Sequence, residues 1–95
     1  MTMYKIWSSP KFKKDLRRIA KRGYDTDRLQ EAIDLLASGE LMPKRYKDHA
    51  LQGNWVGFRE CHISADWLLV YKKINSDKLI LALSRTGTHV DLFKK

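Results

Sequence analysis

The 95-residue sequence lacks several features that would place a protein in a class at once. Its single cysteine, Cys61, excludes an internal disulfide framework and fits a reducing cytoplasm, where we expect it to be a small packed side chain. The longest apolar run, Trp67 to Tyr71, is far shorter than the ~20 residues of a membrane-spanning helix. The first residues also lack the apolar stretch of a signal peptide. We therefore expect a cytoplasmic protein that does not contact a membrane.

Negative charge is scarce as well. Nineteen Lys and Arg residues against eleven Asp and Glu give a net charge of +8 and a pI near 9.8. A content of 43% hydrophobic residues predicts one globular domain, residues 1–95. Such an excess of positive charge favours nucleic acid, an acidic protein or an anionic surface as the partner.

Histidine is absent from the first half of the chain and occurs three times in the second. The segments that contain it are Asp48-His49, His62–Asp66 and Arg85–His89. Imidazole has an ordinary pKa of about 6.5, so it serves as an acid or a base near neutral pH. Each histidine stands near a carboxylate or an arginine in sequence. Together with the positive charge, this predicts chemistry on a polyanion, with RNA as the leading candidate.

The first half reads as a strand followed by two helices. Residues 3–8 alternate as in a strand, and Ser9-Pro10 is a helix start that predicts a helix over 11–22. The second helix should begin near Thr26 or Asp27 and end at Gly39, and the spacing of Asp27 to Gln30 resembles a capping box. Two such helices with a short connection form an antiparallel hairpin.

In the second half the hydrophobic period becomes that of strands. Residues 55–63, 67–74 and 78–85 predict three strands joined by short polar turns, which requires antiparallel neighbours. The tail, 88–95, fits either a short strand or a helical turn. The fold class we expect is α+β in two layers: an N-terminal strand, a helix hairpin and an antiparallel meander.

The first helix separates its residues by type. Phe12, Leu16, Ile19 and Ala20 form one apolar stripe, and basic side chains occupy the rest, with Asp15 as the one acidic residue among them. The basic residues are Lys13, Lys14, Arg17, Arg18, Lys21 and Arg22. Charges of one sign repel each other without forming ion pairs, so a surface for phosphate or an acidic protein segment is favoured over a solvated face.

The second-half residues suit the transesterification of RNA. His49, Asp66 and Arg85 lie near predicted strand ends, and this reaction needs a base, an acid and a fixed positive charge. Simpler alternatives remain open: each histidine as a packing residue, Asp66 as a turn residue, and Arg85 paired with Asp48 or Glu60. Histidine spacings of 13 and 27 match no metal-ligand pattern, so we expect no metal and no cofactor.

Three ordered motifs resemble a known family. They are Tyr46–Trp55, Arg59–His62 with Asp66–Tyr71, and Arg85–Phe93. Their residues and spacing resemble YafQ-type toxins of the RelE/ParE superfamily, which belong to bacterial type II toxin–antitoxin systems. The resemblance covers about residues 46 to 93 closely and the earlier part in layout, and it implies a single RelE-like domain.

The resemblance also implies a function. A toxin of this type is a ribosome-dependent mRNA endonuclease that cuts the codon in the ribosomal A site until a cognate antitoxin neutralises it. It would meet DNA only indirectly, through the antitoxin complex. The implied acid–base set is His49, His62, Asp66 and His89. Our hypothesis makes His89 the acid and either Asp66 or His49 the base.

Further roles follow from the same resemblance. Arg85 would stabilise phosphate charge, and Trp67 and Phe93 would shape the site or hold RNA bases. The expected RNA-binding cations are Lys47, Lys13, Lys14, Arg17 and Arg18. Two rival functions stay open: a gyrase inhibitor of the same superfamily, and a non-catalytic module that binds RNA or an antitoxin.

Overall fold

The structure is a computed structural model that describes residues 3–93, so the ends of the expected domain, residues 1–2 and 94–95, lie outside it. With η for a 3-10 helix, its elements are β1 (Lys5–Ser8), α1 (Pro10–Lys21), α2 (Thr26–Ser38), η1 (Lys44–Tyr46), β2 (His49–Ala50), η2 (Gly53–Trp55), β3 (Arg59–Ser64), β4 (Trp67–Asn75), β5 (Leu79–Gly87) and α3 (His89–Phe93). The α+β class is confirmed. No helix within 3–93 is long and apolar enough to cross a membrane.

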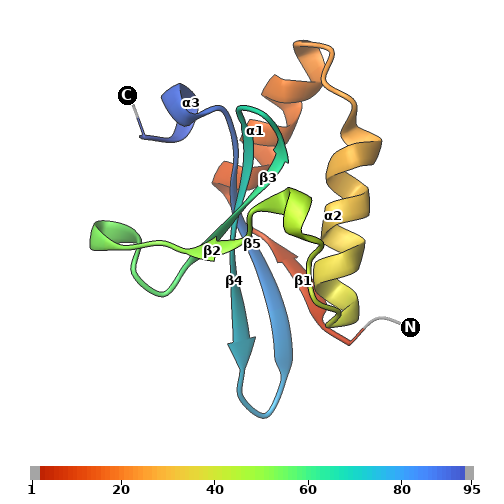
Figure 1. Cartoon of the computed structure of the whole chain (residues 1–95), viewed down its shortest axis with the longest axis vertical. Helices are drawn as coiled ribbons and strands as arrows, with labels where there is room; N and C mark the ends of the chain where they lie inside the picture. Colours follow the sequence, from red (N-terminus) through yellow and green to blue (C-terminus); the bar gives the residue numbers. More distant parts are fainter. Residues whose placement is uncertain (1–2, 94–95) are drawn as a thin grey trace.

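One sheet of five strands organises the fold, in the order β1-β5-β4-β3-β2. Strands β2 to β5 pair antiparallel with their neighbours, whereas β1 runs parallel to β5, with Lys5 opposite Ile80. In Figure 1 the β4–β5 hairpin extends away from α3, and α2 lies alongside the sheet. The first strand of the chain is therefore an edge strand that pairs only with the last strand.

The core lies on both faces of β4. Leu69 and Tyr71 face the larger cluster, which includes Phe12 and Ile19 of α1 and the buried side of α2. Ala20, which its spacing placed on the apolar stripe of α1, is exposed instead. Leu68 and Val70 alternate with Leu69 and Tyr71 and face a smaller cluster that Leu92 of α3 covers. The second face is thus only partly covered, and the candidate site forms there.

The predicted helix starts are half correct. Ser9 caps α1, because its Oγ accepts the Phe12 backbone N–H at 2.9 Å. The predicted capping box of α2 is wrong. Asp25 is the cap and accepts the Asp27 N–H at 3.0 Å, while Gln30 donates to Asp34 one turn later.

Two differences concern the predicted strand 55–63. The strand begins only at Arg59, because Gly53 and Gly57 adopt φ angles of 65° and 94° that bend the preceding segment. That segment forms η2, and the two-residue strand β2 precedes it, which the sequence did not predict. The tail, for which the sequence allows a strand or a helical turn, forms the short helix α3 up to Phe93.

Candidate active site

The three histidines come together at the partly covered face of the sheet. The β2–β3 register places His49 opposite Glu60, and His62 lies two residues further on the same face of β3. Ring centroids are 6.3 Å apart for His49 and His62, and 6.1 Å apart for His62 and His89. We call these three side chains the histidine row. Strand pairing thus brings His49 and His62 together although they are far apart in sequence, and His89 joins them from α3.

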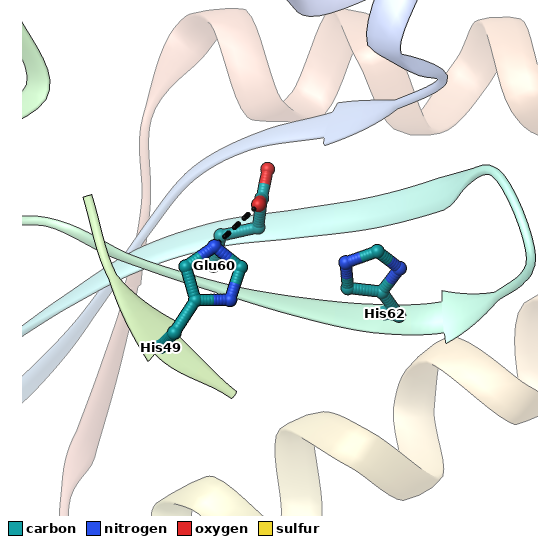
Figure 2. A group of neighbouring side chains, drawn as sticks. All are labelled: His49, Glu60 and His62. Atoms are coloured by element: carbon teal, nitrogen blue, oxygen red, sulfur yellow. Dashed lines mark ion pairs between the residues drawn. The ribbon is translucent and has the colours of Figure 1, made fainter. Parts of the chain in front are cut away.

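His49 has a hydrogen-bond acceptor at each ring nitrogen. Its Nε2 lies 2.9 Å from Glu60 Oε2 (Figure 2). Its Nδ1 lies 2.8 Å from the Lys47 carbonyl oxygen. The side chain of His49 is 50% exposed, whereas that of Glu60 is only 7% exposed. An imidazolium would satisfy both acceptors, so this pair can hold a proton and release it at the surface.

Side-chain hydrogen bonds of Asp48 anchor the segment that carries His49. Asp48 accepts the Tyr71 hydroxyl at 2.5 Å and an Arg59 guanidinium N–H at 3.2 Å. Burial and the Asp48 hydrogen bond raise the pKa of Tyr71 well above its usual range. Because β2 is only two residues long, these side-chain bonds are needed to fix where His49 lies.

His89 is the first residue of α3, and Asp66 holds it. Asp66 Oδ1 lies 2.5 Å from His89 Nδ1 and also accepts the His89 backbone N–H at 3.2 Å. These bonds lower the pKa of Asp66 below its ordinary value. The carboxylate is therefore a weaker base, and its geometry suits it to orient His89 and leave Nε2 available. This favours His49 over Asp66 as the base.

An aromatic pocket adjoins the His89 end of the histidine row. It has a volume of 550 Å³ and is lined by Trp55, His89 and Phe93 among others. The Phe93 ring lies 6.3 Å from His89 and 5.9 Å from Trp55, edge-on to the latter. Phe93 therefore lies where it was expected, at the site. Trp55 was not singled out, because it stands in a segment read as an ordinary strand.

A basic pocket adjoins His62 on another side. It has a volume of 190 Å³, and its lining includes Arg28, Arg45 and Lys47. Lys47 adopts a φ of 47°, which is unusual for a residue other than glycine and turns the chain directly before His49. The histidine row thus has aromatic rings on one side and cations on another, which suits a nucleotide with its base and phosphate.

Trp67 does not match its expected contact with RNA. Its side chain lies in the core with 3% exposure, where its Nε1–H donates to Thr86 Oγ1 at 3.0 Å. The ring also packs edge-on against Tyr24, with centroids 5.0 Å apart. An RNA base cannot stack on a ring enclosed in this way. The alternation of β4 explains the burial, because Trp67, Leu69 and Tyr71 share the helix-facing side.

Arg85 forms an ion pair that the sequence did not predict. Its Nε and Nη2 donate to Asp15 at 2.6 and 3.1 Å, instead of pairing with Asp48 or Glu60. Asp15, read as a surface charge of the basic helix, is only 3% exposed. Hydrogen bonding to Asp15 raises the pKa of Arg85 further. One edge of this guanidinium is therefore occupied by Asp15 of α1.

The basic face of α1 is exposed as expected. Lys13, Lys14 and Arg17 are exposed, whereas Arg18 donates to Asp15 at 2.8 Å and is partly buried. An open depression of 460 Å³ runs between Lys14, Arg17, Arg18, Lys21 and Arg22.

Cys61 is fully buried, as expected, and burial raises its pKa to about 12, so the thiol stays protonated.

Comparison with known proteins identifies the family of this chain. The family described as bacterial toxin of type II toxin–antitoxin system, YafQ, matches residues 4–94. The mRNA interferase toxin YafQ of Escherichia coli K12 is 44% identical over 86 residues, which is 90% of each chain.

Solved structures give the same result. The toxin in the crystal structure of the E. coli DinJ–YafQ toxin–antitoxin complex is 40% identical, covers 96% of this chain and 98% of that chain, and has a TM-score of 0.84. A metal-bound toxin from Helicobacter pylori is 42% identical over 96% and 100% of the two chains, with a TM-score of 0.87. The chain therefore belongs to the YafQ family of toxins from bacterial type II toxin–antitoxin systems.

Proposed function

We propose that this toxin is an mRNA endonuclease that cuts within the ribosomal A site. The observation that carries the proposal is the histidine row, with a carboxylate bonded to each end and a nucleotide-sized pocket beside it. Inhibition by binding alone needs no groups that transfer protons. The printed names of the E. coli relatives, mRNA interferase toxin YafQ, support the same reaction.

The reaction is the attack of a ribose 2′-hydroxyl on the adjacent phosphorus. The His49–Glu60 pair takes the 2′-hydroxyl proton, which comes to lie between His49 Nε2 and Glu60 Oε2, and the new O–P bond closes a 2′,3′-cyclic phosphate. His89, held by Asp66, gives a proton to the departing 5′-oxygen as the P–O5′ bond breaks. His62 stands between the two rings and donates to the phosphorane, where the charge develops.

RNA is positioned by the surroundings of the row. Lys47 and the other cations of the basic pocket take a phosphate, and the second edge of Arg85 adds positive charge. Trp55 and Phe93 offer aromatic edges and faces to a base in the neighbouring pocket. In this proposal Trp55, and not Trp67, supplies the aromatic contact with an RNA base.

The partners follow from the family and the charge. A cognate antitoxin, such as DinJ in the E. coli complex, would neutralise the toxin, and DNA would be contacted only through that complex. The basic face of α1 suits either an acidic antitoxin segment or ribosomal RNA. Location in the cytoplasm is part of this proposal, because ribosomes and mRNA are there.

The test maps mRNA ends after the purified toxin is added to a defined translating ribosome complex. Wild-type protein should cut in the A-site codon and leave a 2′,3′-cyclic phosphate. His89→Ala should lower the cleavage rate by roughly 10²–10⁴-fold, as expected for an acid–base residue, without losing ribosome binding. Lys78→Ala, an exposed change in the turn before β5, is the matched control and should cut normally.

Two outcomes would contradict the proposal. If neither protein cuts, the function moves to gyrase inhibition or a binding role. If His89→Ala loses ribosome binding and cleavage together, the acid assignment fails, because the variant would then be defective before the chemical step.

A further inference from the structure

We infer that Trp7 is a stacking platform for a second base of the RNA strand that the site cuts, and that Lys72 holds a neighbouring phosphate. Trp7 is 54% exposed, whereas tryptophan is on average largely buried. It lies in β1, which pairs with β5 at one edge of the sheet (Figure 1). The identity of the strand rests on the proposed function, but the binding of single-stranded RNA does not depend on cleavage.

The side chain of Trp7 points to the partly covered face of the sheet. Its neighbours in β1, Ile6 and Ser8, line a pocket together with Phe12 of α1, so they point to the helix-facing side. Because successive residues of a strand point to opposite faces, Trp7 points away from the helices. It therefore shares a face with the histidine row.

The neighbours of Trp7 across the sheet leave its ring accessible. Trp7 pairs with Ala82 of β5, and Ala82 pairs with Lys72 of β4, so the three side chains form one row on this face. The alanine methyl group is too short to cover an indole ring. A base can therefore stack on Trp7 from the solvent side, with the exposed Lys72 on the other side of Ala82.

The same face leads from this row to the site without a change of side. Val70 and Leu68 alternate with buried residues of β4 and share the face of Lys72, and Leu68 lies opposite His62. With about 4.8 Å between strands and about 3.3 Å per residue, Trp7 lies roughly 20 Å from His62. A base on Trp7 is therefore a different base from the one in the aromatic pocket.

Lys72 supplies the positive charge that such a strand needs. Its Nζ lies 5.5 Å from the centroid of the Phe58 ring, a cation–π contact that holds the ammonium group at the surface. Phe58 is edge-on to Trp55, with centroids 5.5 Å apart, and Trp55 lines the aromatic pocket. Single-stranded RNA binds to surfaces on which aromatic rings stack with bases and cations contact phosphates. Such a surface extends from the aromatic pocket to Trp7.

The binding experiment uses a short single-stranded RNA in which fluorine replaces every 2′-hydroxyl, so that it cannot be cut. Fluorescence anisotropy gives its affinity at several salt concentrations. Trp7→Ala should weaken binding by about 5- to 100-fold with an unchanged salt slope, because a stacked base neutralises no phosphate. Lys72→Gln should instead lower the slope of log affinity against log salt by about 0.7, the value for one phosphate of a single strand.

Further variants separate stacking from stability. Trp7→Phe keeps an aromatic ring and should retain most of the affinity, whereas Trp7→Leu keeps only an apolar side chain and should bind as weakly as Trp7→Ala. Leu41→Ala removes a 95% exposed apolar side chain in the loop after α2 and should bind like wild type. In the ribosome assay Trp7→Ala should raise KM with little change in kcat, because its contact is remote from the reacting bonds.

The outcomes separate the platform from the nuclease. No binding of the short RNA by wild type, unchanged affinity in Trp7→Ala, or equal losses in Trp7→Phe and Trp7→Leu would overturn the platform. If Trp7→Ala weakens only the binding of ribosomes without mRNA in the A site, the base belongs to ribosomal RNA, and the assignment to the cut strand is wrong. Weaker binding of the short RNA by Trp7→Ala, in a protein that never cuts, would keep the platform and refute only the nuclease.

Discussion

At the scale of single residues, Asp15 joins the helix layer to the end of β5. Its two oxygens accept from Arg85, from the Thr86 backbone N–H at 3.1 Å and from Arg18. Thr86 in turn accepts the Trp67 indole N–H and donates to the Leu68 carbonyl at 2.7 Å. A chain of buried polar contacts thus connects α1, β5 and β4 directly before the segment that leads to His89.

Asp15→Asn should be strongly destabilising. The amide replaces one acceptor by a donor that faces Arg85, and it leaves a largely buried guanidinium without its counter-charge. Removing one partner of such a pair costs about 3 kcal/mol or more in the free energy of unfolding. Urea unfolding measures this. Arg18→Ala, at a residue whose side chain is 39% exposed, should cost less than about 1 kcal/mol, and equal costs for the two variants would contradict the assigned role of Asp15.

The residues of the site were predictable to different degrees. The three histidines stood out because imidazole is rare and chemically specific, and each was found at the site. Glu60 was visible only as a possible partner of Arg85, since its contact with His49 depends on a strand of two residues. Asp15 was misread, because a helical wheel shows its neighbours on α1 but not Arg85, which is far along the chain.

At the scale of elements, α3 is a five-residue helix that positions two site residues. Thr88 and Asp91 cap it reciprocally: Asp91 accepts the Thr88 N–H at 3.0 Å, and Thr88 Oγ1 accepts the Asp91 N–H at 3.2 Å. Arg22 at the end of α1 donates twice to the same carboxylate, at 2.7 and 3.1 Å. Helices this short are not stable alone, so these bonds hold α3 against the fold.

This arrangement makes stability depend on pH. Arg22 and Thr88 lower the pKa of Asp91 well below its ordinary value. A carboxyl group whose pKa is lower in the folded state stabilises the fold fully at pH values above its unfolded pKa of about 3.9. This stabilisation is lost as the pH falls through the folded pKa. Asp91→Asn should therefore destabilise most at neutral pH and progressively less below about pH 4.

The measurement is urea unfolding of wild type and Asp91→Asn across that pH range. Asp34→Asn is the control for the change from carboxylate to amide, because Asp34 is an exposed helix carboxylate bonded only by Gln30 in the structure of residues 3–93. A constant gap between wild type and Asp91→Asn at all pH values would contradict the ionic contribution of Arg22.

The elements themselves were largely predictable, and their errors have physical causes. Apolar period and a serine cap located α1, and alternation located β4 and β5. The strand predicted over residues 55–58 is absent, because glycines with positive φ bend a segment whose composition resembles a strand. The parallel pairing of β1 with β5 could not be predicted from the sequence, since a local pattern carries no information about which distant strand is the neighbour.

At the scale of the whole molecule, charge is distributed unevenly around the site. The basic face of α1 borders one open depression, and Arg28, Arg45 and Lys47 border a separate pocket beside His62. Phosphate contacts release counterions, so they raise affinity at low salt without sequence preference. The first surface would then hold the toxin on its large target, and the second would hold the scissile strand.

Neutralising α1 should reduce the salt dependence of ribosome binding. Lys14→Gln with Arg17→Gln should lower the slope of log affinity against log salt by about 0.7–0.9 for each phosphate that the helix no longer neutralises. Lys5→Gln with Lys78→Gln removes the same charge from exposed positions elsewhere and is the control. Equal slopes in the two double variants would assign the basic face of α1 to the antitoxin or to solvent alone.

The position of β5 between β1 and β4 governs when the protein becomes harmful to the cell that makes it. A nascent chain that has not yet produced β5 lacks the partner of β1, the arginine that Asp15 binds and the helix that carries His89. Such an intermediate can pair β2 with β3 but lacks His89, so the histidine row is complete only after nearly the whole chain has been made.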